Sequence, residues 1–67
     1  MTYSKEVIPF AEAVNIGIEY AKNGDSNLLN DCINDAQKYI TQYPQWKDQF
    51  KDLMIRAQLV MTLASLL

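Results

Sequence analysis

The chain has 67 residues, of which 49 % are hydrophobic and 21 % charged, with only two glycines and two prolines. This composition places it among globular rather than disordered proteins, and we expect residues 1–67 to form one small helical domain with a limited core. The formal net charge of −2 has the wrong sign for a phosphate-binding surface, which argues against direct binding of nucleic acid.

Apolar residues at helical spacing predict a first helix over residues 9–22. One stripe of this segment holds Phe10, Val14, Gly17 and Ala21. Pro9 suits a first helical turn, where its missing N–H is tolerated, so the preceding residues are expected to be a loose lead-in or a kinked extra turn. The stretch NGDS at residues 23–26 predicts a tight corner, with a left-handed helix end followed by an Asp or Ser cap.

The second segment predicts a helix over residues 27–42. Its apolar stripe contains Leu29, Ile33, Ala36, Ile40 and Tyr43, and its opposite face is polar. Pro44 forces the chain out of this helix and can serve as an early residue of the next one.

The third and longest helix is predicted over residues 45–65. Its apolar stripe contains Trp46, Phe50, Leu53, Ala57, Val60, Ala64 and Leu67. A second apolar stripe, Ile55, Leu59, Leu63 and Leu66, lies beside the first in the later half only, because no charged residue follows Arg56. A helix that is apolar around most of its circumference must be covered on more than one side. The chain is therefore expected to be all-α, with three antiparallel helices in sequence order.

The middle of the chain, residues 13–44, resembles a tetratricopeptide-repeat helical hairpin. The resemblance lies in Ile16-Gly17, in Tyr20 three residues later, in Gly24-Asp25 at the corner and in Ala36 in the second helix. It implies that the second helix packs closely against Gly17 near Ala36, with Tyr20 filling the neighbouring space. Because such repeats bury their faces against further copies, the resemblance also implies that the third helix takes the place of a following repeat and that a partner or a second copy completes the stack.

The sequence offers little chemistry that would support catalysis or cofactor binding. Histidine is absent, and Cys32 has no neighbouring cysteine and occupies an apolar helical position, which favours a small buried side chain. Asp31 and Asp35 share a helical face with polar neighbours and fit a solvated surface better than a catalytic pair. No calcium-loop or phosphate-loop pattern is present. We expect no enzyme activity, cofactor, metal or small-molecule substrate.

The ends of the chain carry no recognisable targeting or membrane signal. The opening MTYSKEVIPF lacks the features of a secretory signal, and the closing QLVMTLASLL is shorter than the roughly 20 apolar residues of a bilayer span. A single cysteine cannot form an internal disulfide. A cytoplasmic protein without a membrane span is the expectation.

Protein–protein interaction is the function class that remains. The residues expected to bind a partner are Trp46, Ile55, Leu59, Leu63 and Leu66. The chain is interpreted as a small adaptor, assembly factor, chaperone or inhibitor that binds another protein or forms a homodimer through its third helix. The alternative is a structural subunit that folds fully only within a larger assembly. The sequence leaves open whether the closing stretch QLVMTLASLL is an interface or part of the core of a three-helix bundle.

Overall fold

The computed structural model describes residues 2–66, which form helices α1 (Ile8–Lys22), α2 (Asn27–Gln42) and α3 (Lys47–Leu66), with a short 3-10 turn, η1 (Pro44–Trp46), before α3. No strand occurs in this part of the chain. The predicted all-α arrangement is confirmed. The predicted boundaries agree closely with the observed ones, except that the 3-10 turn occupies the expected start of the third helix.

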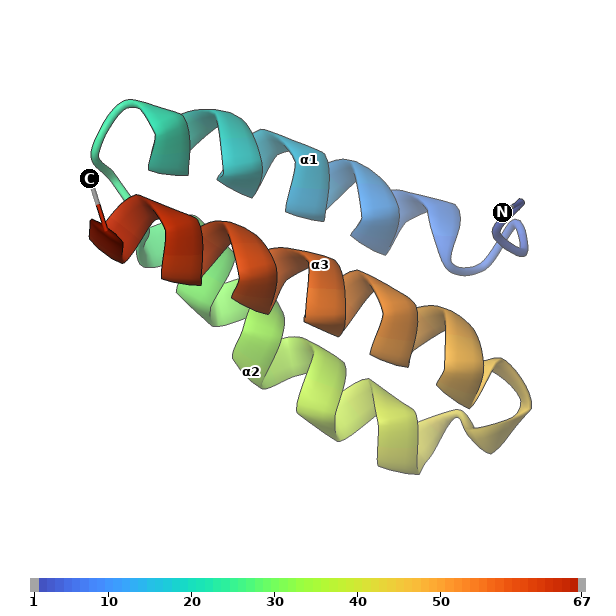
Figure 1. Ribbon diagram of the computed structural model, residues 1–67. Helices are drawn as coiled ribbons and strands as arrows, with labels where there is room; N and C mark the ends of the chain where they lie inside the picture. Colours follow the sequence, from blue (N-terminus) through green and yellow to red (C-terminus); the bar gives the residue numbers. More distant parts are fainter. Residues whose placement is uncertain (1, 67) are drawn as a thin grey trace.

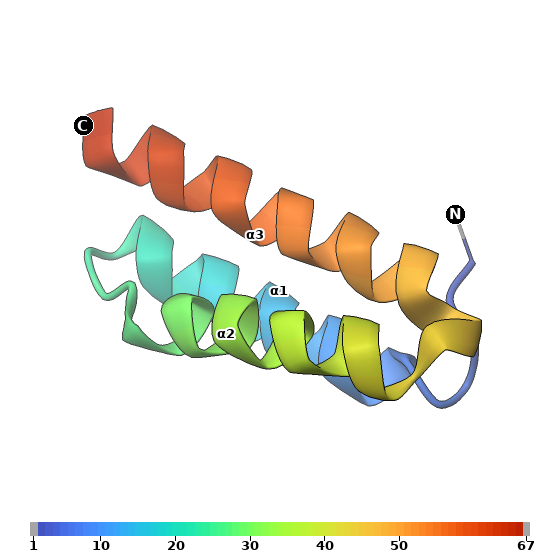
Figure 2. The same cartoon turned by 90° about the horizontal axis from the view of Figure 1, so that it is seen from below.

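The three helices run up, down and up along one long axis, and α3 packs against both α1 and α2 (Figures 1 and 2). The molecule measures 36 × 18 × 18 Å along its principal axes. α1 and α3 therefore run in the same direction, and the end of α3 lies at the same end of the molecule as the end of α1.

The corner between α1 and α2 is built as the sequence predicts. Gly24 has a φ of +93°, and its N–H donates to the carbonyl of Ala21 at 3.1 Å, while the Asp25 N–H donates to the carbonyl of Tyr20 at 2.9 Å. These two bonds satisfy carbonyl groups that the end of a helix leaves free. The Asp25 carboxylate accepts from the N–H of Asn27 at 3.1 Å, so Asp25, rather than Ser26, provides the side-chain cap of α2.

α1 and α2 approach each other most closely at Gly17, but not with the partners that the repeat resemblance implied. A Cβ atom at Gly17 would stand 3.2 Å from both the N and the Cα of Leu29, so the close contact is with Leu29 and not with Ala36. The reason is register: in an antiparallel hairpin that turns at residues 23–26, Ala36 lies too far along α2 to face Gly17. The Tyr20 side chain is 51 % exposed and does not fill the space between the helices, so that expectation is also wrong.

The core forms where the three helices meet. Its buried side chains are Val7, Ala11, Val14, Ala21, Leu29, Cys32, Phe50, Leu53 and Ala57. Burial, followed by the nearby Asp35 and Asp31 carboxylates, raises the pKa of the Cys32 thiol. The thiol is therefore protonated at neutral pH, and Cys32 acts as a small apolar side chain.

Residues 2–7, the N-terminal strap, are an ordered part of the fold rather than a loose lead-in. Residues 5–7 form the alternative that was expected, an extra turn before α1, in which the N–H groups of Val7 and Ile8 donate to the Ser4 carbonyl at 2.8 and 3.1 Å. The Tyr3 hydroxyl donates to the Asp52 carboxylate at 2.6 Å. Ser4 and Gln49 exchange two bonds: the Ser4 N–H donates to Gln49 Oε1 at 2.6 Å, and Gln49 Nε2 donates to Ser4 Oγ at 2.9 Å. Val7, at the end of the strap, is fully buried. The strap therefore covers one flank of the first turns of α3.

With 20 residues, α3 is longer than α1 and α2, which have 15 and 16. From its predicted length we would expect the end of this helix to project beyond the hairpin, but that expectation is wrong, because in both views this end reaches about as far as the α1–α2 corner (Figures 1 and 2). The extra length of α3 lies at its beginning, where the strap rather than α1 accompanies it. Leu67, expected in the core stripe, lies outside the described residues.

Candidate functional site

The second apolar stripe of α3, here called the outer stripe, is exposed in the single chain. The exposed fractions are 53 % for Ile55, 59 % for Leu59, 55 % for Leu63 and 78 % for Leu66. These four residues recur every three or four positions and so form one continuous ridge along the helix. Large, clustered apolar side chains on the surface are typical of interaction sites. The outer stripe is therefore not part of the core of the isolated chain.

The outer stripe remains uncovered because neither the strap nor the α1–α2 hairpin extends over it. Toward the start of α3, the same flank carries Gln49 and Asp52, and the strap covers it there through hydrogen bonds. Toward the end of α3, the helix diverges from the α1–α2 hairpin (Figure 2). An apolar hollow of about 400 Å³ lies there between the ends of α1 and α3, lined by Ile18, Ala21, Lys22, Gly24, Val60, Leu63 and Ala64. Leu63 thus belongs to both the ridge and the hollow.

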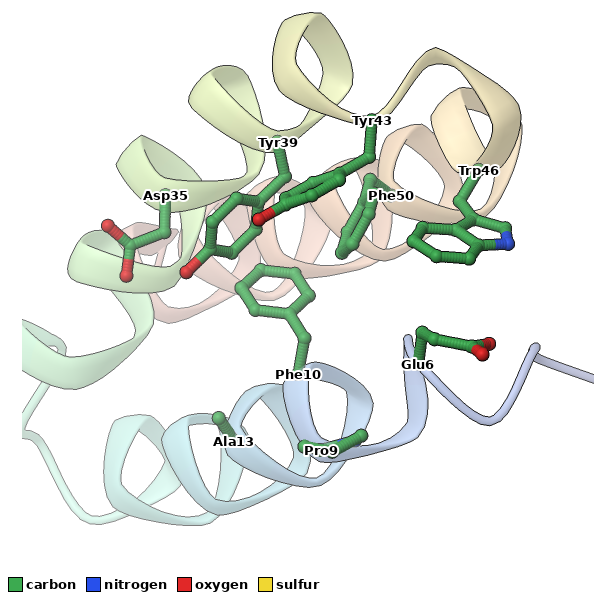
Figure 3. Close-up of a pocket in the computed structure, with 9 residues that line it drawn as sticks. All are labelled: Glu6, Pro9, Phe10, Ala13, Asp35, Tyr39, Tyr43, Trp46 and Phe50. Atoms are coloured by element: carbon green, nitrogen blue, oxygen red, sulfur yellow. The ribbon is translucent and has the colours of Figure 1, made fainter.

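A second surface, here called the aromatic cleft, lies between the first half of α1 and the second half of α2 (Figure 3). It has a volume of about 660 Å³ and is lined by Glu6, Pro9, Phe10, Ala13, Asp35, Tyr39, Tyr43, Trp46 and Phe50. Phe10 meets Tyr39 and Phe50 edge-on, with ring centroids 5.4 and 5.5 Å apart. These distances are typical of favourable aromatic pairs. The rings come from all three helices and η1 and form a packed wall.

The polar groups of the aromatic cleft are unpaired within the described chain. Among residues 2–66, no side-chain hydrogen bond involves Tyr39, Tyr43 or Trp46. Glu6 and Asp35 make no ion pair there either, because the ion pair found in this part of the chain joins Lys22 to Glu19 at 3.3 Å. Asp35, expected on a solvated surface, is instead half-buried at the edge of the cleft.

The five residues predicted to bind a partner fall on two separate surfaces. Ile55, Leu59, Leu63 and Leu66 lie together on α3, whereas Trp46 is half-buried and lines the aromatic cleft. Sequence reasoning did not find the cleft. Tyr39 in α2 and Tyr43 directly after its end, four residues apart, were an available signal, but Phe10, which packs against Tyr39, is distant in the sequence.

Among residues 2–66, no three acidic, cysteine or histidine side chains gather as they would around a metal ion. None of the three helices, as far as they are described, combines the length and apolar character of a bilayer-crossing helix.

Comparison with known proteins adds no further assignment. The chain has no significant match to any protein-family model, curated protein sequence or solved structure.

Proposed function

We propose that the chain is a non-enzymatic protein–protein interaction module, and that a second copy of the chain covers the outer stripe. The observation that supports this proposal most strongly is that four large apolar side chains on successive turns of α3 are each more than half exposed. Monomeric proteins rarely leave such contiguous patches open. Burial of apolar surface stabilises an interface by about 25 cal/mol per Å² before the costs of association are subtracted.

The surroundings of the outer stripe favour a helix as the covering element. The ridge formed by Leu59, Leu63 and Leu66 has the spacing that packs against the apolar ridge of another helix. The hollow beside Leu63 offers about 400 Å³ into which a partner side chain can insert. A ridge next to a hollow is a self-complementary shape, because the ridge of one copy can enter the hollow of the other.

A second copy is the occupant that the charge pattern favours. No charged residue follows Arg56 in the sequence, so two identical α3 ends can meet without repulsion between like charges. A twofold contact uses the same patch on both chains and therefore leaves no open apolar edge. If the sequence resemblance of residues 13–44 to a tetratricopeptide hairpin extends to stacking, a second copy would complete that stack.

The experiment compares two double variants that add the same charge to the same turns of α3. Leu59→Glu with Leu63→Glu places two carboxylates on the outer stripe, whereas Gln58→Glu with Thr62→Glu places them on the exposed neighbouring face. Light scattering coupled to size-exclusion chromatography measures the mass, and circular dichroism measures the helix content. The proposal predicts a dimer for the native chain and the control, and a folded monomer for the stripe variant.

Three results would contradict the proposal. A native chain that is monomeric at all accessible concentrations has no self-contact to lose. A stripe variant that remains dimeric places the interface elsewhere. An isolated native chain that is molten or aggregated favours the alternative function, a structural subunit that folds fully only within a larger assembly.

A further inference from the structure

The aromatic cleft has the chemistry of a binding site that is independent of the outer stripe. None of its lining residues belongs to the outer stripe. One of its walls is a chain of ring contacts: Tyr39 lies 5.2 Å from Phe50, Tyr43 lies 6.2 Å from Phe50, and Tyr43 lies 5.9 Å from Trp46, measured between centroids. Phe50 is buried and fixes this wall, while Tyr43 remains 40 % exposed and Trp46 half-buried. The cleft therefore presents ring surface to a ligand on a rigid support.

The charges around the cleft favour a positively charged ligand. Glu6 and Asp35 lie at opposite ends of the row of rings (Figure 3), and no lysine or arginine lines the cleft among the described residues. Both carboxylates lack a protein ion-pair partner within residues 2–66. The faces of aromatic rings attract cations as well, so the walls and the two ends favour the same sign of charge.

The hydrogen-bonding groups of the cleft restrict the chemical class of the ligand further. The two carboxylates only accept hydrogen bonds, and the hydroxyls of Tyr39 and Tyr43 can also accept them. A ligand that pairs with a carboxylate must offer hydrogen-bond donors, and a ligand that covers the rings must be flat enough to stack on them. The arginine guanidinium combines five N–H donors with a planar cation, whereas the lysine ammonium is a compact point charge. The cleft volume, about 660 Å³, exceeds that of a single side chain and leaves space for neighbouring residues of the ligand.

We propose that the aromatic cleft binds an arginine-containing segment of a partner protein. The guanidinium stacks on the accessible ring surface of Tyr43 and Trp46 and donates hydrogen bonds to Glu6, the carboxylate at the Trp46 end of the row of rings, while Asp35 at the other end adds to the negative charge of the cleft (Figure 3). The apolar neighbours of that arginine contact Pro9 and Ala13 on the α1 side of the cleft. The proposal does not depend on dimerisation, because the cleft and the outer stripe share no residue.

Trp46 makes the site directly observable, because it is the sole tryptophan of the chain and lines the cleft. The probe is the capped peptide Ala-Leu-Arg-Leu-Ala, compared with the same peptide carrying lysine or glutamine in place of arginine. We expect the arginine peptide to change the Trp46 emission in a saturable way, with an affinity roughly tenfold above that of the glutamine peptide and with the lysine peptide between them. Equal affinities of the three peptides would overturn the proposal.

Matched variants distinguish the cleft from general attraction to an acidic protein. Glu6→Gln with Asp35→Asn removes the two cleft carboxylates, and Glu12→Gln with Glu19→Gln removes two exposed carboxylates of α1 outside the cleft lining. We expect the first pair to lower the affinity for the arginine peptide roughly tenfold and the second to leave it nearly unchanged. Circular dichroism checks that both pairs fold. Equal losses in the two pairs would overturn the proposal, as would equally tight binding of capped free arginine, which would indicate a small-cation site.

Discussion

The two halves of α3 differ in burial, and the difference is the opposite of what their compositions suggest. Residues 47–57 carry all of the helix's charged side chains, yet they also contain its three buried residues, Phe50, Leu53 and Ala57. Residues 58–66 carry no charge, yet none of them is buried, and Leu59, Leu63 and Leu66 are more than half exposed. The charged half supplies the buried residues of α3, whereas the apolar half packs against the core only partly, at Val60 and Met61, and is otherwise at the surface.

The difference between the halves shows that burial depends on what covers a helix as well as on what the helix carries. The first half is covered by α1 and α2 on one side and by the strap on another, and the strap meets its polar flank with hydrogen bonds. The second half has the hairpin on one side only. Its composition fits a covering element that the single chain does not supply.

Truncating one leucine in each half of α3 is expected to give the largest difference in the free energy of unfolding. Leu53 is fully buried, so Leu53→Ala should lower the free energy of unfolding by about 2–5 kcal/mol. Leu63 is 55 % exposed, so Leu63→Ala should change the stability of the monomer by no more than about 0.5 kcal/mol. Urea unfolding at low protein concentration measures both values. Equal losses would mean that the second half is core.

The close contact between α1 and α2 can be tested at Gly17. Leucine at this position would collide with the backbone of Leu29, which a rotamer change cannot move, and should destabilise the domain by about 1–3 kcal/mol. Gly17→Ala is the control, because its smaller clash is offset by about 1 kcal/mol of helix propensity. A thermal melt in which Gly17→Leu behaves like the native chain would show that the helices do not meet here.

The hydrogen bond that holds the strap on the first half of α3 should make a smaller contribution to stability, and this contribution should depend on pH. Tyr3→Phe removes the bond to Asp52 and should cost about 1 kcal/mol at neutral pH. Burial, and then the hydrogen bond to Asp52, raise the pKa of the Tyr3 phenol above its ordinary 10.0. A raised folded-state pKa means that this stability is complete below pH 10 and is lost as the pH climbs through the folded pKa.

The measurement for the strap is the difference in unfolding free energy between the native chain and Tyr3→Phe across this pH range. The difference should shrink as the phenol ionises. A difference that stays constant above the folded pKa would show that the hydroxyl does not hold the strap in place.

The sequence was sufficient to predict the helices and much of the core. The spacing of Leu29, Phe50, Leu53 and Ala57 identified buried positions, because helical periodicity is a local property of the chain. The corner at Gly24 was also predictable, because a left-handed helix end depends on the residue type at that one position.

Contacts between distant segments were not predictable from these patterns. The bond from Tyr3 to Asp52 joins residues 49 positions apart, and nothing local to either residue indicates the other. The register of α1 on α2 placed Leu29 opposite Gly17, where the tetratricopeptide resemblance implied Ala36. The aromatic cleft combines residues from distant segments of the chain, so Trp46 was recognised as a candidate anchor, but Phe10 and the α1 side of the cleft were not. The outer stripe was predictable because all four of its residues lie on one helix.

The most direct test of the central claim, that a second copy covers the outer stripe, is a nuclear Overhauser experiment on a mixture of isotope-labelled and unlabelled chains. Only contacts between different chains give signals in the filtered spectrum. We expect intermolecular signals from the methyl groups of Leu59, Leu63 and Leu66, and none from the buried Leu53. A concentrated sample without intermolecular signals at these three leucines would contradict the claim.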